Sequence, residues 1–194
     1  MNSLLSLLLS RRSPRREARR RCIPRRLYVE ALEDRTVPTA VALPSNAVSW
    51  WTANSTANDA LGLNNATLSN VTYTTGEVGK AFSFNGLNGW AALGDPSSLA
   101  FTASFTIEGW IKVNGLPGNY NFGSIMFRGD DRPGLDPYQL VITKNGDLQF
   151  GISGTNGGAS VEAPIPTGQF VHVAATLDDG TGAMTLYENG AVVA

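Results

Sequence analysis

The chain has 194 residues, of which 42% are hydrophobic and only 16% are charged. This length accommodates one domain of ordinary size plus a tail, and the 21 glycines and 10 prolines favour a turn-rich, all-β domain over a helical one. The single cysteine, Cys22, excludes an intramolecular disulfide. No apolar run approaches the roughly 20 residues of a membrane-spanning helix, so we expect no transmembrane segment.

The overall net charge of −1 conceals a strong asymmetry along the chain. Up to Pro38 there are ten arginines and four acidic residues, a net charge of +6, which leaves −7 for the remainder. We therefore divide the chain into a basic targeting tail, residues 1–45, and a domain, residues 46–194. The arginine density of residues 11–26 leaves too little apolar surface to offset the entropy of ordering, so the tail is predicted to be disordered.

Three functions fit a basic tail: binding of nucleic acid, attachment to an anionic membrane surface, and export. A fourth interpretation is a solvated extension without a partner. Arg11–Arg26 has no interleaved aromatic residues and no helix-turn-helix or zinc pattern, so no nucleic-acid partner is expected. Leu4–Leu9 is short and precedes the basic cluster, which reverses the order of a secretory signal.

The end of the tail has a more specific pattern, the sequence IPRRLYVEALEDRTVP at Ile23–Pro38. It resembles the N-terminal element of many surface and exported proteins of planctomycete-type bacteria, in which a basic run precedes a short LEDR-x-x-P box. Leu32–Arg35 and Pro38 match that box. The resemblance implies an exported protein of the cell envelope or extracellular space, with an atypical export signal.

Within the domain, apolar residues at period two indicate strands with one buried face. Strands are expected at Ala47–Trp51, Ala66–Tyr73, Lys80–Phe84, Trp90–Leu93, Ser104–Val113, Tyr138–Lys144, Asp147–Ile152 and within Gln169–Val193. Loops are expected at Thr52–Asn65, Gly115–Asn121 and Asp130–Pro137. No segment of ten residues shows helical periodicity, so the pattern predicts a sandwich or barrel.

Two Asn-Gly pairs predict β-hairpins. Asn189-Gly190 lies between two β-forming segments, and a type I′ turn requires positive φ at both of its central residues. Asn145-Gly146 predicts a second hairpin, with Lys144 and Asp147 flanking the turn as a complementary pair.

The order of motifs from Ala47 onward resembles the laminin-G-like module of the concanavalin A-like lectin/glucanase jelly rolls. The matching motifs are G-x-A-x-x-F-x-G at Gly79–Gly86, T-I-E-x-W at Thr106–Trp110, H-V-A-x-T-x-D at His172–Asp178 and L-Y-x-N-G at Leu186–Gly190. The resemblance implies a jelly-roll sandwich of two antiparallel sheets. Phe170 stands where the family usually has Trp, and the family continues with further strands beyond the second hairpin. We therefore expect a C-terminally incomplete domain whose open edges favour self-association.

The candidate ligand-binding residues are Glu108, Trp110 and His172. Glu108 and Trp110 share one face of the strand Ser104–Val113, opposite Phe105 and Ile107. Trp110 is expected to be largely buried or to line a concave face, because an exposed Trp in a flat strand favours aggregation. His172 is expected to be a polar residue on the less buried face of its sheet.

No catalytic residues are assigned. Nucleophile triads, metalloprotease motifs and phosphate loops are absent from the sequence, and a glycosidase requires two carboxyl groups at a defined separation. Only Glu108 is acidic in its strand, so we do not expect an enzyme.

Calcium is the one cofactor considered. The resemblance implies a single ion at a loop rim, and Asp59, Asn85 and Asp95 are the candidate ligands because calcium prefers oxygen donors. The alternative is that these side chains form Asx turns.

The function expected from these patterns is a non-catalytic binding or adhesion module that recognises a glycan or a surface protein. Two alternatives stay open: a purely structural or interaction module of a larger surface protein, and a glycoside hydrolase or lyase of the same fold.

Overall fold

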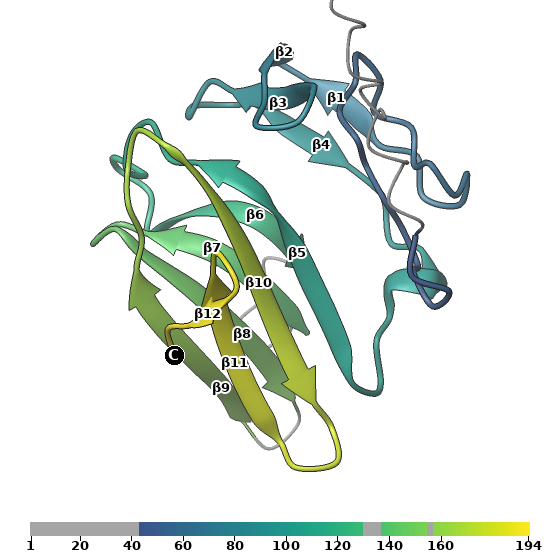
Figure 1. Ribbon diagram of the computed structural model, residues 1–194, viewed down its shortest axis with the longest axis vertical. Helices are drawn as coiled ribbons and strands as arrows, with labels where there is room; N and C mark the ends of the chain where they lie inside the picture. The colour runs from purple at the N-terminus through teal and green to yellow at the C-terminus, as the bar shows by residue number, and fades with distance from the viewer. Residues whose placement is uncertain (1–42, 130–136, 155–156) are drawn as a thin grey trace, which may run out of the picture. The chain divides into compact units, whose positions relative to one another are not determined.

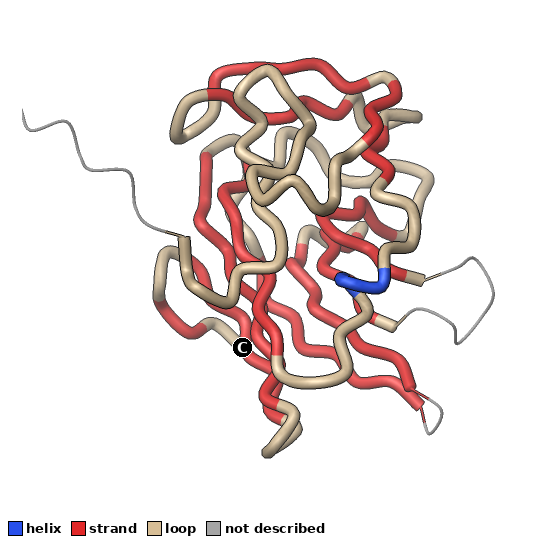
Figure 2. The backbone as a smooth tube through the Cα atoms, turned by 90° about the vertical axis from the view of Figure 1, so that its right-hand side faces the viewer, coloured by secondary structure: helices blue, strands red, loops and turns tan. Residues whose placement is uncertain are grey.

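The computed structural model describes residues 43–129, 137–154 and 157–194, and Leu43–Ala194 forms one compact unit. Strands dominate the described backbone, and its only helix is the three-residue 3-10 helix η1, Ser97–Leu99 (Figure 2). In these ranges no helix has the length and apolar character needed to cross a membrane. The predicted all-β class is confirmed, whereas the basic tail up to residue 42 lies outside the described residues.

The first five strands are β1 (Thr67–Ser69), β2 (Val71–Thr75), β3 (Lys80–Phe84), β4 (Trp90–Ala92) and β5 (Phe105–Lys112). They are followed by β6 (Phe122–Arg128), β7 (Tyr138–Thr143), β8 (Asp147–Gly154) and β9 (Gly157–Pro164). The last are β10 (Phe170–Asp178), β11 (Ala183–Glu188) and β12 (Ala191–Val192).

Two four-stranded antiparallel sheets pack face to face, which is the expected jelly-roll type of sandwich (Figure 1). One sheet has the strand order β12-β11-β10-β5, and the other has the order β6-β7-β8-β9. The buried core between them is made of Val113, Leu140, Ile142, Leu148, Phe150, Ile165, Val171, Val173, Ala175 and Leu186. Two further two-stranded sheets, β1-β4 and β2-β3, were not part of the expectation.

The hairpin at Asn189-Gly190 is confirmed in detail. Both central residues have positive φ, 49° at Asn189 and 81° at Gly190, as a type I′ turn requires. Asn189 also fixes the turn to β10, because its Oδ1 accepts the N–H of His172 at 3.1 Å and its own N–H donates to the His172 carbonyl at 2.8 Å.

The hairpin of β7 and β8 is also confirmed, but its turn has a different geometry. Since β7 ends at Thr143 and β8 begins at Asp147, three residues rather than two form the loop. The Gly146 N–H donates to the Thr143 carbonyl at 3.1 Å, and Gly146 has a φ of 91°, the arrangement of a three-residue loop with glycine in the left-handed position. Lys144 therefore lies in the loop and does not flank it opposite Asp147.

The N-terminal part departs most from the expected strands. Residues 47–51 form no strand, and only an isolated bridge joins Trp51 to Asp59. The strand expected at residues 66–73 is divided into β1 and β2 by Asn70, which has a φ of 53°. A left-handed residue breaks the pleat, so the two halves pair with different partners, β4 and β3.

Sequence patterns did not predict β6 and β9. Between Ser124 and Met126 the pairing of β6 with β7 shifts register, so the alternation of its side chains is interrupted. The strand β9 begins with Gly157 and Gly158 and ends at Pro164, residue types that are typical of turns.

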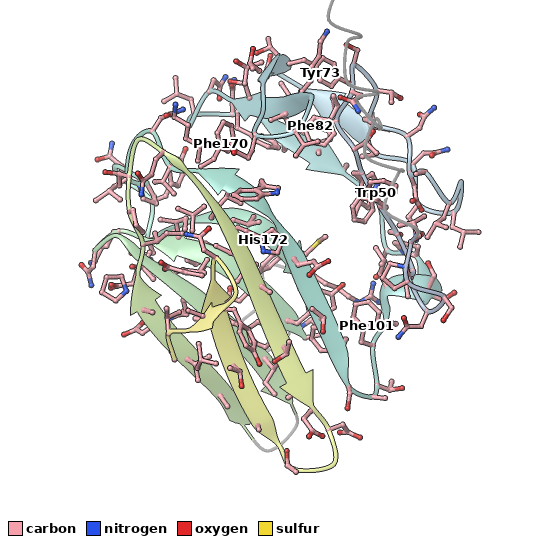
Figure 3. All side chains as sticks on the ribbon, viewed as in Figure 1. Trp50, Tyr73, Phe82, Phe101, Phe170 and His172 are labelled. Atoms are coloured by element: carbon pink, nitrogen blue, oxygen red, sulfur yellow. The ribbon has the colours of Figure 1, made fainter. Side chains whose placement is uncertain are left out.

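Aromatic stacking joins the segment before β5 to the sandwich. The Phe101 ring stacks on Phe105 with a centroid distance of 4.8 Å and lies 5.5 Å from the ring of Tyr138 (Figure 3). Phe105 in turn meets the buried Phe150 edge to face at 5.8 Å. The start of β5 is therefore fixed against β7 and β8 by rings from three elements.

One charged residue lies on the core side of a sheet. Glu188 pairs in register with Val173, which is buried in the core, so both side chains point between the sheets. Its Oε1 is buried and has no hydrogen-bond partner among the described residues. Burial raises the pKa of this carboxyl above its ordinary value, because the charged form loses its hydration.

This burial predicts that Glu188→Gln stabilises the protein at neutral pH. A carboxyl with a raised folded-state pKa destabilises the fold once pH rises through that pKa, because the group must then be buried with a charge. We expect the free energy of unfolding to increase by up to about 1 kcal/mol at pH 7 in the variant. The gain should disappear below pH 4.5, the ordinary pKa of a glutamate carboxyl, where the group is protonated in the folded and the unfolded state. Denaturant titrations at pH 7 and below pH 4.5 measure the two values of the unfolding free energy. An equal gain at both would contradict the electrostatic cause.

Candidate functional site

The candidate site is the side of the sheet β12-β11-β10-β5 that points away from the core, which we call the outer face. Successive side chains of a strand point to opposite sides, and β5 shows this alternation as half-buried and exposed residues in turn. The register of the four strands therefore assigns to the outer face Thr106, Glu108, Trp110, Lys112, Phe170, His172, Ala174, Thr176, Asp178, Ala183, Thr185, Tyr187 and Val192.

Trp110 and His172 form the centre of the outer face. They are direct cross-strand partners in the pairing of β5 with β10. Their rings meet edge to face, with a centroid distance of 5.2 Å and an interplanar angle of 70°. The backbone N–H and carbonyl of His172 are both bonded to Asn189, and β10 is paired with β5 on either side of this residue, so the imidazole is presented from a rigid position.

A second aromatic contact lies beside this pair. Phe170 precedes His172 by two residues on β10, and Figure 3 labels both of them on that strand. The Lys112 ammonium stands over the Phe170 ring, 5.7 Å from its centroid, which is within the range of a cation–π interaction. The outer face thus combines aromatic rings with a positive charge that is exposed to solvent.

Glu108 brings the only carboxylate of β5 to this surface. Its cross-strand partner is Ala174, and the next residue in the same row is Tyr187 on β11. The neighbours of Glu108 on its own strand and face are Thr106 and Trp110. No second carboxylate therefore adjoins Glu108 among the outer-face residues.

The three ligand-binding residues expected from sequence thus lie together on one face of one sheet. His172 is half-buried on the less buried face of its sheet. Trp110 is not largely buried, because 45% of its surface is exposed, so that half of the expectation is wrong and the other half, that it lines a concave face, stays a prediction. The expectation was based only on the tendency of an exposed Trp to cause aggregation. In the structure the indole contacts the His172 ring edge to face, and the rest of the indole is exposed to solvent.

The sequence analysis did not name Lys112, Phe170 or Tyr187 as binding residues. The signal was present in the alternation, because Lys112 shares parity with Trp110, and Phe170 shares parity with His172. Tyr187 is found only through the register of β11 with β10, which depends on the type I′ turn that follows it.

The candidate calcium ligands have other roles in the described structure. Asp59 is only 4% exposed, and its carboxylate accepts the N–H groups of Trp50 and Leu61 on Oδ1 and that of Asn64 on Oδ2, at 2.8–3.0 Å. Asn64 continues this network through its own side chain, which bonds to Ser49 and Ser98. Asp59 is thus the centre of the hydrogen-bond network that organises the loop before β1.

Asn85 and Asp95 are used locally as well. The Asn85 Oδ1 accepts the N–H groups of Leu87, Asn88 and Gly89 at 3.0–3.1 Å, so the Asx-turn alternative is confirmed there. Asp95 forms an ion pair with Arg128 of β6. The described residues contain no group of three His, Cys, Asp or Glu side chains suited to a metal, and calcium binding stays a prediction.

Comparison with a family model supports the fold of the domain. Residues 84–194 match the laminin-G family model described as the concanavalin A-like lectin/glucanases superfamily. The crystal structure of an S-layer domain-containing protein from Clostridium thermocellum is similar, with 24% identity over 75% of this chain and 70% of that chain, and a TM-score of 0.48. A search of curated proteins finds no match. The LEDR element of the tail has no support from these comparisons and stays a prediction.

The Asp59 network predicts a stability that depends on the carboxylate. Burial by itself raises the pKa of Asp59, but the hydrogen bonds from Trp50, Leu61 and Asn64 outweigh it and hold the pKa below its ordinary value of 3.8. A lowered folded-state pKa contributes stability that is present above 3.8 and is lost as pH falls through the folded-state value.

We therefore expect Asp59→Asn to lower the free energy of unfolding by about 1–3 kcal/mol at pH 7. The amide NH₂ replaces one carboxylate oxygen and cannot accept the backbone N–H that was bonded to it. Asp178→Asn is the matched control, since the single N–H that Asp178 accepts, from Gly180, can still bond to Oδ1. Denaturant unfolding at pH 7 and at pH 3 measures both variants. An equal loss in the two variants, or no loss in Asp59→Asn, would refute the role of the network.

Proposed function

Since the chain belongs to the concanavalin A-like lectin/glucanase superfamily, we propose that its domain is a non-catalytic module that binds glycan on the outer face. The observation that carries this proposal is the Trp110–His172 pair, in which an indole that is 45% exposed is fixed in position by a neighbouring ring. Superfamily membership supports a binding module in general, and the outer face is where we assign the ligand.

The chemistry of the outer face suits a sugar. A pyranose ring presents an apolar face of C–H groups, and an exposed aromatic ring offers a complementary flat surface. Glu108 accepts hydrogen bonds, Lys112 donates them and His172 does either, which are the functions needed to orient sugar hydroxyls. Because these polar groups flank Trp110 on the same face, one sugar stacked on the indole would lie within their reach.

The absence of catalysis is part of the proposal. Retaining and inverting glycosidases require two carboxyl groups about 5–9.5 Å apart on either side of the scissile bond. Glu108 is followed in its row by Ala174 and Tyr187, neither of which is acidic. The outer-face carboxylate of Asp178 lies four residues along β10 from Ala174, about 13 Å, which exceeds that separation. A hydrolase or lyase of the same fold is the alternative, and Glu108 would be its acid.

We extend the proposal to location. We place the protein outside the cytoplasm, in the cell envelope or the extracellular space. This location is consistent with a glycan-binding module and with the LEDR element at Leu32–Arg35. That element lies outside the described residues. In this setting the module would serve adhesion, and a surface protein is the alternative ligand.

The proposal predicts that Trp110→Ala weakens glycan binding at least tenfold, since loss of an aromatic anchor from a binding surface commonly costs about 2 kcal/mol. Trp90→Ala is the matched control, because Trp90 is 51% exposed on β4, outside the outer face. A glycan array identifies the ligand, and calorimetry compares the affinities of the two variants with the unmodified chain.

Three results would change the assignment. A chain that binds no glycan on the array and no polysaccharide in a pull-down would favour a protein ligand or a purely structural module. Equal losses in both Trp variants would place the site elsewhere. Release of reducing sugar that disappears in Glu108→Gln would establish the hydrolase instead.

A further inference from the structure

The side chains of the outer face lie in rows that run across β5, β10 and β11 (Figure 1). Residues that pair in register present neighbouring side chains on one face, and successive rows on that face are two residues apart. The first row contains Trp110 and His172. The second row contains Glu108, Ala174 and Tyr187. The outer face therefore has an order across the strands as well as along them.

The third row consists of hydroxyl side chains. Thr106, Thr176 and Thr185 pair in register across the same three strands, so one hydroxyl follows another at the strand spacing of about 4.8 Å. Each hydroxyl donates one hydrogen bond and accepts others. A regular series of such groups suits a ligand whose own polar groups repeat in the direction across the strands.

Two aromatic side chains of the outer face lie on opposite sides of β10. Trp110 belongs to β5 and is 45% exposed, whereas Tyr187 belongs to β11 and is half-buried. Neighbouring strands are about 4.8 Å apart and successive rows about 6.8 Å, which separates the two residues by about 12 Å. This distance is wider than one pyranose ring, so a single sugar contacts one of the two rings only.

The residue between the two rings is small. Ala174 is the direct partner of Tyr187 and the diagonal neighbour of Trp110, and its side chain is a single methyl group. Along β5, by contrast, Trp110 has the exposed Glu108 and Lys112 as its neighbours on the same face. A sugar chain that starts on Trp110 can therefore continue over β10 toward Tyr187, whereas along β5 it meets a long charged side chain in either direction.

We propose that the outer face binds the interior of an extended, unbranched polysaccharide that crosses β5, β10 and β11, with one sugar on Trp110 and another on Tyr187. This inference rests on the proposed function, because it gives a length and a direction to the ligand of the same face. The sugar between the two rings lies over Ala174. Its hydroxyls are within reach of Glu108 and His172, which adjoin Ala174 on the same face.

The two aromatic contacts cooperate only when one ligand spans both. Once a chain is stacked on Trp110, its contact with Tyr187 is intramolecular and gains from a high effective concentration. A monosaccharide has no such gain, because it occupies one ring at a time. Affinity should therefore rise with chain length until both rings are occupied, and should change little beyond that length.

A series of oligosaccharides tests the length. The probes are β-1,4-linked oligomers of glucose, of N-acetylglucosamine and of mannose, each from the monosaccharide to the hexasaccharide, because these chains are extended and the face of a sheet is open. NMR titration of the full chain measures the affinities. In at least one series the trisaccharide is expected to bind at least tenfold more tightly than the monosaccharide, which is the contribution of one aromatic anchor. From the tetrasaccharide to the hexasaccharide the affinity should change less than about threefold.

Substitutions test the direction. Tyr187→Ala should reduce the gain with length from tenfold to less than about threefold, whereas Tyr187→Phe should retain it, because the ring remains. Ala174→Gln should also reduce the gain, because it places a long side chain between the two rings. Tyr120→Ala is the matched control, since Tyr120 is 62% exposed on the loop between β5 and β6, outside the outer face. Circular dichroism confirms that all four variants fold.

The outcomes separate this inference from the proposed function. Equal affinities for the monosaccharide and the trisaccharide in every series that binds overturn the inference and leave the proposed function in place. A gain with length that persists in Tyr187→Ala, or that is lost equally in Tyr120→Ala, overturns the path across β10. Binding of no oligomer from any series also overturns the inference, and the glycan array then decides separately whether the outer face binds another sugar.

Discussion

The domain depends on a single layer of apolar side chains that holds the two four-stranded sheets together. Phe150, Val173 and Leu186 are each at most 1% exposed, and they come from β8, β10 and β11. Rings from Phe101 and Tyr138 extend this layer to the start of β5. Since no disulfide is possible with one cysteine, this burial is the main stabilising term for the sandwich.

The same layer determines which residues are available to a ligand. Burial of Val171, Val173 and Ala175 on the core side requires Phe170, His172 and Ala174 to point outward, because the side-chain period of a strand is two. A shift of β10 by one residue would bury His172 and expose Val173. The outer face is therefore as well determined as the core, and its composition is a consequence of packing.

The elements that could be predicted from sequence are those with local causes. The alternation in β5 and β10 and the positive φ of Asn189 and Gly190 follow from residue type within a few positions. Two features do not follow from local residue type. One is the hydrogen bond that the Trp50 N–H donates to Asp59 across its loop, and the other is the division of β1 from β2 at Asn70. The first depends on which distant backbone N–H groups the Asp59 carboxylate meets after folding, and the second on the different partners of β1 and β2, and no local pattern contains either. The candidate residues were found for the same reason, since strand parity groups them, whereas Tyr187 required the register of a third strand.

The core side directly beneath the candidate site is unusual for a sandwich. Gly109, Val173 and Glu188 lie in register across β5, β10 and β11, so only Val173 of the three contributes an apolar side chain. The adjacent row, Ile107, Ala175 and Leu186, is apolar throughout. Departures from the expected pattern are typical of functional positions, because they are retained against their cost in stability. A glycine that leaves open space and a carboxylate with a buried oxygen that has no partner among the described residues both occur next to the Trp110–His172 pair. The face to which we assign binding thus lies over a row in which only Val173 contributes an apolar side chain to the core.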